Sequence, residues 1–351
     1  MAIRFSDATN GFFQIGKETT YRIESTNYGN PIPLPDGATS PDEHADDVAR
    51  SVLAGRGEGA MYKLRNRSEG GLTIAWDYDV MGRFLHGIMG TSESDAEGST
   101  GLFENYESAA NELPSFSIKK TIGDTLFKYI GFVFDMVKIS YSGGNLMELE
   151  FNGHSDPPIL TSIGSNPAFL AFEPAFHKRF TTFQIMGFDL KDLCESFDLT
   201  IGRSLDTDRW SVGSQRAKPV PNGPLTVALS LAAKWDDAIY GGGTSGTGYL
   251  GLWRALSAAQ TISPSTIDHD NGGSGIAQRS CRFYLPSTRC TGVRIDPRSR
   301  GSANNATADF RGLDADLPAA VLGAQGSGVS AARTNSPIGI RNTSQEQHST
   351  F

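Results

Sequence analysis

"FKYIGFVFDMVKISYSGGNLMELEFNG", from Phe127 to Gly153, contains the most regular alternation of apolar and polar residues in the chain. The alternating apolar residues are Val137, Ile139 and Tyr141 before Gly143-Gly144, and Met147, Leu149 and Phe151 after it. A period of two on both sides of a Gly-Gly turn predicts a β-hairpin with one apolar and one polar face. The polar face consists of Lys138, Ser140, Ser142, Glu148, Glu150 and Asn152. The apolar face must therefore cover either the protein's own core or a neighbouring copy.

The length and composition of the chain favour a mainly β protein. Its 351 residues fit two domains of moderate size. It contains 40 Gly and 17 Pro and few long stretches of helical periodicity, which indicates many short strands joined by turns. The formal net charge of −8 argues against a general nucleic-acid-binding protein, because such proteins carry an excess of Lys and Arg.

The cysteines and the N-terminus indicate where the chain is made. Cys194, Cys281 and Cys290 are odd in number and lack the CxxC spacing of a metal site, which favours a reducing compartment. No apolar signal-peptide core follows Met1, and no run of about eighteen apolar residues occurs. We therefore expect a soluble chain made in a cytoplasm.

The chain contains an internal repeat of a strand followed by a helical segment. "GGLTIAWDYDVMGRFLHGIMG" (Gly70 to Gly90) aligns without a gap with "GPLTVALSLAAKWDDAIYGGG" (Gly223 to Gly243). In the first copy, one apolar stripe of helical spacing comprises Val80, Met81, Phe84, Leu85 and Ile88. The hairpin has a weaker second copy, in which Gly312 matches Gly153 and the alternating residues are Val293, Ile295, Ala306, Ala308 and Phe310. The repeat predicts two tandem domains, each with a flanking helix.

The predicted domain boundaries follow segments rich in Pro, Gly and Ser. Residues 1–158 form the first β domain, residues 159–318 the second, and residues 319–351 a C-terminal arm. Residues 1–20 are expected to act as an N-terminal arm. Residues 28–47 contain four prolines and are predicted to be a long acidic loop that lies outside any sheet. Within the C-terminal arm, only "PIGIRN" (Pro337 to Asn342) has the pattern of a strand.

Two glycine-rich motifs resemble ligand-binding loops without the context that such loops need. "GTGYLG" (Gly246 to Gly251) satisfies GxGxxG, but it follows more glycines instead of a buried strand. "DHDNGG" (Asp268 to Gly273) resembles a calcium loop but lacks the EF-hand ligand order and the closing Glu. We expect a flexible loop and an Asx-rich turn, and neither a cofactor nor a metal.

The remaining candidates for chemistry are histidines and tryptophans. No two of the six histidines have the i, i+4 spacing of a helical zinc site. His154-Ser155-Asp156 places triad residue types side by side, but no GxSxG nucleophile elbow occurs. The four tryptophans, which would suit a sugar-binding platform but more often pack in cores, are Trp76, Trp210, Trp235 and Trp253. The sequence predicts no enzyme and leaves a soluble carbohydrate- or ligand-binding β-sandwich as the alternative function.

Several segments, in order, resemble the tail tube proteins of long-tailed bacteriophages. They are "FFQIGKETTY" (Phe12 to Tyr21), the strand-helix unit from Gly70, "LPSFSIKK" (Leu113 to Lys120) and the hairpin itself. "FDLTIGRSLDTDRWSVGS" (Phe197 to Ser214) and "PNGPLTVALSL" resemble the second half of these proteins. The likeness covers nearly all of residues 12–312.

The resemblance implies a β-sandwich or barrel with one flanking helix, closed into rings that stack into a hollow tube. DNA passes through such a tube without specific binding, and the tube has no catalytic, cofactor or metal site. The six polar hairpin residues, from Lys138 to Asn152, would then face the lumen. Further implied partners are the tail tip or baseplate and the tail terminator, and the implied location is the virion tail after assembly in the bacterial host cytoplasm.

The internal repeat also predicts the stoichiometry of the ring. Six repeats, the number that the resemblance suggests, would come from three chains, which gives a homotrimer with pseudo-sixfold symmetry. The alternative is a homohexamer in which residues 159–318 form an outer decoration domain.

Overall fold

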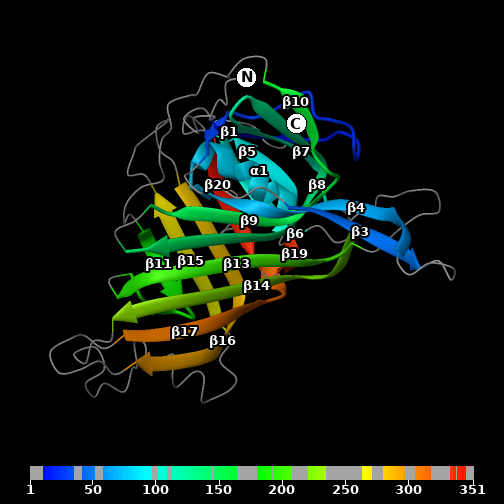
Figure 1. Cartoon of the computed structure of the whole chain (residues 1–351). Helices are drawn as coiled ribbons and strands as arrows, with labels where there is room; N and C mark the ends of the chain where they lie inside the picture. Colours follow the sequence, from blue (N-terminus) through cyan, green and yellow to red (C-terminus); the bar gives the residue numbers. More distant parts are fainter. Residues whose placement is uncertain are drawn as a thin grey trace.

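The computed structural model describes residues 11–34, 42–51, 58–96, 102–108, 113–143, 146–163, 180–191, 193–207, 220–234, 263–270, 280–296, 305–317, 333–336 and 338–344. These residues form twenty strands and one helix, which confirms the predicted mainly β fold (Figure 1). All strand pairs are antiparallel. Among the described residues, no helix is long and apolar enough to span a membrane.

The largest layer, here called the long sheet, has eight strands. In order they are β3 (Asp42–Ser51), β4 (Glu58–Ala75), β9 (Glu148–Ser155), the second half of β8 (Thr125–Ser142), β13 (Cys194–Asp206), β14 (Val220–Lys234), β17 (Asn305–Leu313) and the second half of β16 (Ser280–Asp296). Figure 1 shows β9, β13, β14, β17 and β16 one below another. The long sheet therefore runs without interruption from the first half of the chain into the second.

Two further sheets cover the long sheet. The cap sheet consists of β2 (Ile32–Pro33), β1 (Phe12–Lys17), β7 (Phe116–Ile122), the first half of β8 and β10 (Ile159–Ser162). The back sheet consists of β12 (Phe188–Asp189), β11 (Phe180–Ile185), β15 (Ser263–Asp270), the first half of β16, β20 (Gly339–Ser344), β6 (Leu102–Ser108) and β5 (Gly90–Ala96). A separate two-stranded ladder joins β18 (Ala315–Leu317) to β19 (Arg333–Ser336).

Two long strands bend from one sheet into another. β8 leaves the cap sheet near Gly131, whose φ of 70° lies in the left-handed region that glycine adopts easily. β16 leaves the back sheet near Pro286, which has no N–H to donate to a ladder. Each strand contributes to two layers, so the sandwich is held together by its backbone as well as by its core.

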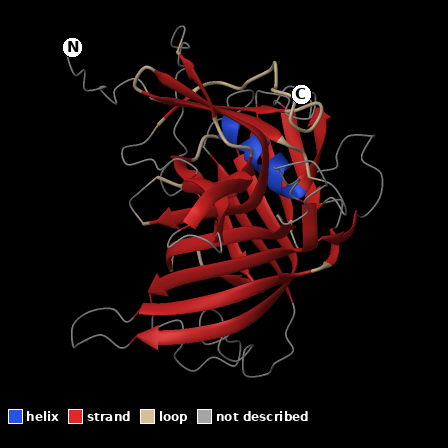
Figure 2. Ribbon diagram, turned by 45° about the vertical axis from the view of Figure 1, so that its right-hand side comes forward, coloured by secondary structure: helices blue, strands red, loops and turns tan. Residues whose placement is uncertain are grey.

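Figure 2 shows α1 (Tyr78–Met89) among the strands, and it contacts β1 of the cap sheet, β13 of the long sheet and β20 of the back sheet. The predicted apolar stripe is buried, and Phe84 contacts Phe13 of the cap sheet and Phe151 of the long sheet. The helix ends before Gly90, which has a φ of 94°. The buried Arg203 of β13 donates to the carbonyls of the last helical turn, with Nε 3.2 Å from the oxygen of Ile88. A strand from the second half of the chain thus caps a helix of the first half.

Some predicted loop and arm segments are strands. Residues 12–17, expected in the N-terminal arm, form the buried strand β1. The prediction that residues 28–47 lie outside any sheet is wrong, because β2 pairs with β1, and β3 begins at Asp42. Pro33 is tolerated because β2 is an edge strand. The predicted last strand near residues 337–342 is confirmed as β20, which joins β16 of the second half to β6 of the first.

The register of the strands adjusts the internal alignment of the repeat. Gly153 pairs with Gly70, whereas Gly312 pairs with Val227 instead of the aligned Gly223. The strand is therefore shifted by four residues from the sequence alignment. An even shift keeps the same side chains on the apolar face, so sequence periodicity alone does not detect it. The helix predicted for the second copy lies mostly beyond Lys234, outside the described residues.

Candidate functional site: the polar face of the long sheet

All six polar hairpin residues lie on the same face of the long sheet. Lys138 pairs with Glu150 across β8 and β9, and Ser140 pairs with Glu148. Their neighbours in sequence, including Val137, are buried beneath the sheet. The remaining polar positions, Ser142 and Asn152, follow the same alternation. The predicted division into one apolar and one polar face is therefore confirmed.

The polar face continues across the second half of the chain. Ser140 lies opposite Asp198 of β13, Asp198 opposite Ser230 of β14, and Ser230 opposite Asp309 of β17. Lys138 Nζ is 3.4 Å from Asp198 Oδ1, and Ser230 Oγ donates to Asp309 Oδ1 at 2.7 Å. Between these positions the alternate residues are buried; they include Phe197, Leu199, Leu229, Leu231, Ala308 and Phe310. One face of the long sheet is thus polar, and the other face covers the core.

The hairpin itself occupies the interior of the sheet. β9 pairs with β4 on its far side, and β8 pairs with β13. Both outer edges of the hairpin are therefore filled within one chain. Neither outer edge of the hairpin is therefore open to pair directly with a neighbouring subunit. β3 pairs only with Glu58–Glu69 of β4, whereas β9 pairs with Ser68–Ala75, so along Gly70–Ala75 the described edge strand is β4 itself; the other described edge is the second half of β16.

Sequence reasoning missed three arginines on the polar face. Arg289 and Arg294 of β16 and Arg311 of β17 are exposed, and they pair in register with positions on this face. A bulge between Cys290 and Gly292 breaks the period of two, so the alternation that places Arg294 on the polar face would place Arg289 on the opposite face. The described carboxylates of the face are Glu148, Glu150, Asp198 and Asp309, and the described cations are Lys138, Arg289, Arg294 and Arg311. The carboxylates and cations of this list are equal in number.

The catalytic and ligand motifs are not assembled by the structure. His154 faces Glu69 and Asp135 at 3.7 and 3.5 Å, whereas Asp156 forms an ion pair with Arg22 at 3.1 Å, so no triad forms. In the part of the chain that the structure describes, no group of three or more His, Cys, Asp and Glu residues is arranged to hold a metal.

The remaining motif residues have structural roles where the structure describes them. Trp76 is fully buried against Phe283 and is not available to a sugar. Asp268, the first residue of the calcium-like motif, receives two hydrogen bonds from Arg282. Trp210, Trp235, Trp253 and residues 246–251 lie outside the described residues.

The three cysteines are free thiols without reactive character. Cys281 and Cys290 are buried, and Cys194 is half-buried. Burial raises the pKa of Cys194 to about 12, which leaves its thiol protonated at neutral pH. These residues therefore behave as small apolar groups in the core.

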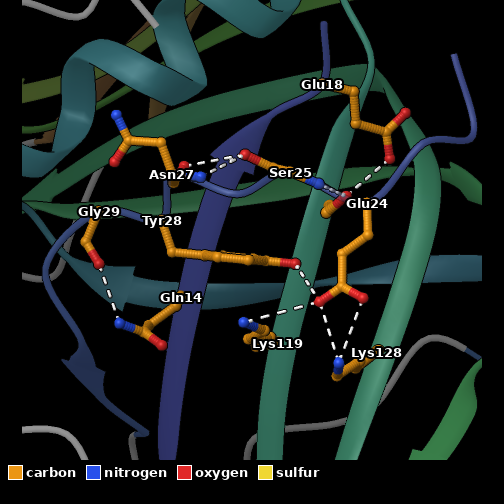
Figure 3. A network of polar contacts seen from close by, with 10 residues as sticks. Gln14, Glu18, Glu24, Ser25, Asn27, Tyr28, Gly29, Lys119 and Lys128 are labelled. Carbon is orange, nitrogen blue, oxygen red and sulfur yellow. Dashed lines mark hydrogen bonds and ion pairs between the residues drawn. The ribbon is translucent and has the colours of Figure 1, made fainter. Parts of the chain in front are cut away.

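A second polar network fixes the segment of residues 18–29 against the cap sheet (Figure 3). Glu24 forms ion pairs with Lys128 at 3.0 Å and Lys119 at 3.7 Å, and it accepts a hydrogen bond from Tyr28 at 3.2 Å. Gln14 of β1 donates to the carbonyl of Gly29 at 3.0 Å. The segment is thus held at both ends by side chains of β1, β7 and β8.

The fold fits a structural role. It is a β-sandwich with one buried helix in the described residues and a long sheet that is polar on one face. The family model for phage tail tube protein matches residues 8–263, which is more than half of the chain. The chain belongs to the phage tail tube protein family. The match extends from before β1 through β14, so it covers the hairpin and its junction with the second half of the tail tube protein. No curated protein matches the chain.

Membership of the family defines the general role of this tail tube protein. It is a structural component of a bacteriophage tail, in a family without enzymatic activity. It self-associates into a tube and contacts other tail proteins. Its place in the virion is therefore the tail.

Proposed function

We propose that the tail tube protein closes into rings through the two edges of its long sheet, and that the stacked rings conduct DNA during ejection. The observation that carries this proposal is the uninterrupted eight-stranded sheet, which is packed on a core on one side and polar on the other. A closed barrel of such sheets presents its polar side chains to an aqueous bore. Closure also removes the exposed strand edges, which otherwise promote aggregation.

The lumen-facing residues in this proposal are Lys138, Ser140, Ser142, Glu148, Glu150 and Asn152, as the sequence predicted. The second half of the chain contributes Thr200, Ser230, Asp309 and Arg311 to the same face. Lys138, Arg311 and Arg289 lie in one row across the strands, and the carboxylates Glu148, Asp198 and Asp309 lie in the next row, so the cations that could grip phosphates are flanked by anions. DNA would therefore slide through without specific binding.

Two tandem tail-tube-type units in one chain support a ring of three chains. The first four strands of the long sheet, β3-β4-β9-β8, have the same pairing order as the last four, β13-β14-β17-β16. We infer that residues 1–158 and 159–318 are copies of one unit, with pseudo-sixfold symmetry in a homotrimer. Linking two units raises the effective concentration of their contact to about the millimolar range. The β8–β13 pairing argues against the alternative homohexamer, in which residues 159–318 would form a separate outer domain.

Stacked rings leave two open ends that need other proteins. A head-to-tail contact does not close on itself, so the tube grows until a partner covers its end. We propose that the tail tip or baseplate protein and the tail terminator are these partners. The three free thiols agree with assembly in the reducing cytoplasm of the bacterial host.

Electron cryo-microscopy of the purified tail tube protein, reconstructed without imposed symmetry, tests this proposal. We expect hollow tubes with three chains in each ring and the β8–β9 hairpin on the inner wall. Six chains in each ring, or residues 159–318 wholly outside the wall, would contradict the trimer. Solid filaments, or a hairpin on the outer surface, would contradict the bore assignment.

A further inference from the structure

We propose that Arg289 and Arg311 form a binding site for a phosphate group on the polar face of the long sheet, and that the phosphate belongs to the backbone of DNA. The two arginines lie on the neighbouring strands β16 and β17, in the second half of the chain. The site itself follows from these side chains and their surroundings, whereas the choice of DNA as the source of the phosphate rests on the proposed function.

The two cations of the site have no described anion as a partner. Arg289 lies directly opposite Arg311 in the antiparallel ladder, and both side chains are exposed on the polar face. Among the described residues, neither guanidinium forms an ion pair. Like charges directly opposite each other on neighbouring strands are destabilising. An anion bound between the two arginines would remove this repulsion.

A β-bulge brings Arg289 to the same face as Arg311. The register shifts between Cys290 and Gly292, so β16 has one residue more than β17 at this point. Without the additional residue, the alternation that puts Arg294 on the polar face would put Arg289 on the opposite face. Bulges re-aim side chains in this way and are over-represented next to functional sites. The backbone therefore departs from regular pairing where it places the second guanidinium beside the first.

The surroundings of the pair leave both guanidiniums available. On its other side Arg311 lies opposite Ala228 of β14, whose side chain is too short to cover it. Asp309 is two residues from Arg311 on the same face, but its Oδ1 accepts from Ser230 Oγ at 2.7 Å. The backbone carbonyl of Asp309 accepts from Thr291 Oγ1, on the bulge, at 3.0 Å. The side chain of Asp309 is thus held toward β14, and it does not neutralise the arginine pair.

A phosphate group has the charge and the geometry that two neighbouring arginines bind. A guanidinium is planar and always charged, and it donates parallel N–H bonds to phosphate oxygens. Residues directly opposite each other on antiparallel strands have Cβ atoms about 4.5–5.5 Å apart, so two arginines can reach one phosphate together. In the proposed bore the anion that passes this face is DNA, which has one phosphate charge per about 1.7 Å of helix axis.

The contact with DNA would be independent of base sequence and short-lived. Contacts to phosphate carry no direct sequence information. The neighbouring row of the face contains the carboxylates Glu148, Asp198 and Asp309, which repel the phosphates on either side of the bound one. A duplex would therefore touch the arginine pair and move on, which agrees with conduction.

The urea midpoint of the unassembled subunit, measured in sodium phosphate and in sodium chloride of equal ionic strength, tests the site. The variants of the full chain are R289Q and R311Q. The control is R294Q, which removes one exposed cation from the same face of β16, opposite Thr307 instead of a second arginine. Phosphate also stabilises proteins in general, because it is excluded from their surface. The control measures this general effect, and a specific site adds a stabilisation that depends on its occupancy.

We expect phosphate to raise the midpoint equally in the wild-type protein and in R294Q, and by about half as much or less in R289Q and R311Q. In chloride, R289Q and R311Q should be at least as stable as the wild-type protein, because the like-charge contact is gone. An equal rise in all four proteins would overturn the proposal.

A short, fluorescently labelled DNA duplex tests the source of the phosphate. Its binding to the unassembled subunit is measured by anisotropy over a series of salt concentrations. At low salt, R311Q should bind the duplex about fivefold more weakly than R294Q, and the slope of log affinity against log salt should be smaller by about one. Equal affinities of R311Q and R294Q would overturn DNA as the ligand.

Assembled tubes separate a failure of this inference from a failure of the proposed function. If the polar face lines a bore, wild-type tubes should bind the linear duplex more tightly than R311Q tubes, whereas closed circular DNA cannot thread and should show no such difference. A difference between the two kinds of tube with closed circles would contradict the bore and leave the phosphate site standing. Tubes that show no difference with either form of DNA would overturn DNA as the ligand.

Discussion

Glu18 is expected to stabilise the tail tube protein because its carboxylate is buried and fully hydrogen-bonded. The side chain is only 5% exposed. It accepts hydrogen bonds from Ser115 Oγ at 2.7 Å, Ser117 Oγ at 2.8 Å, the Arg22 N–H at 2.9 Å and the Gly131 N–H at 2.8 Å. The donors come from the segment of residues 18–29, from Ser115 and the adjoining strand β7, and from the bend of β8. One carboxylate therefore joins three parts of the cap sheet.

The substitution Glu18→Ala removes the acceptor and leaves these donors in place. The two serine hydroxyls can rotate toward other acceptors, but the two backbone N–H groups cannot. A buried donor without an acceptor costs about 1–3 kcal/mol. The Gly131 N–H is buried and the Arg22 N–H is only part-buried, so water can reach the second of these groups. We therefore expect the free energy of unfolding to fall by about 2–4 kcal/mol.

Urea unfolding of the unassembled subunit, followed by tryptophan fluorescence, measures this loss. The matched control is Glu24→Ala, which removes a carboxylate from the same segment. The Glu24 side chain is 33% exposed, and its ion pairs with Lys119 and Lys128 should contribute less than about 1 kcal/mol. Glu18→Gln, which retains one acceptor oxygen, should lie between the control and Glu18→Ala. Equal midpoints for Glu18→Ala and Glu24→Ala would refute the role given to the buried network.

Three further outcomes test other parts of the structure. Burial lowers the pKa of His86 from 6.5 to about 4. As the pH falls, the unfolded chain therefore binds a proton at this histidine before the folded protein does. The free energy of unfolding should decline by up to about 3 kcal/mol from pH 6.5 to pH 4. His86→Leu should flatten this part of the urea-midpoint profile, and an unchanged slope would contradict the assignment. Gly87→Ala should destabilise the subunit, although Ala has the better helix propensity, because the new Cβ would lie 2.3 Å from Phe134 Cδ2. A higher urea midpoint in this variant would show that the contact relaxes. Replacing Glu148 and Glu150 by Lys should leave tubes intact but slow DNA ejection, most strongly at low salt, and unchanged ejection kinetics would argue against their position in the bore.

Local features of the sequence determined the faces of the strands and the one described helix. The period of two around Gly143-Gly144 defines the hairpin and its polar residues, because successive side chains in a strand point to opposite sides whatever the strand pairs with. The stripe from Val80 to Ile88 likewise defines the buried side of α1. These patterns depend only on neighbours within a few residues along the chain.

Only the tertiary structure decided which strands pair. The β8–β13 junction joins residues about sixty apart in the chain, and β20 joins β6 to β16. The sequence of one strand does not show which other strand it pairs with. The four-residue shift of β14 preserves its apolar face and is therefore invisible to periodicity. The bulge near Cys290 likewise concealed the face on which Arg289 lies. The sequence alternation specifies a polar face, whereas long-range pairing and register decide that this face spans both halves of the chain.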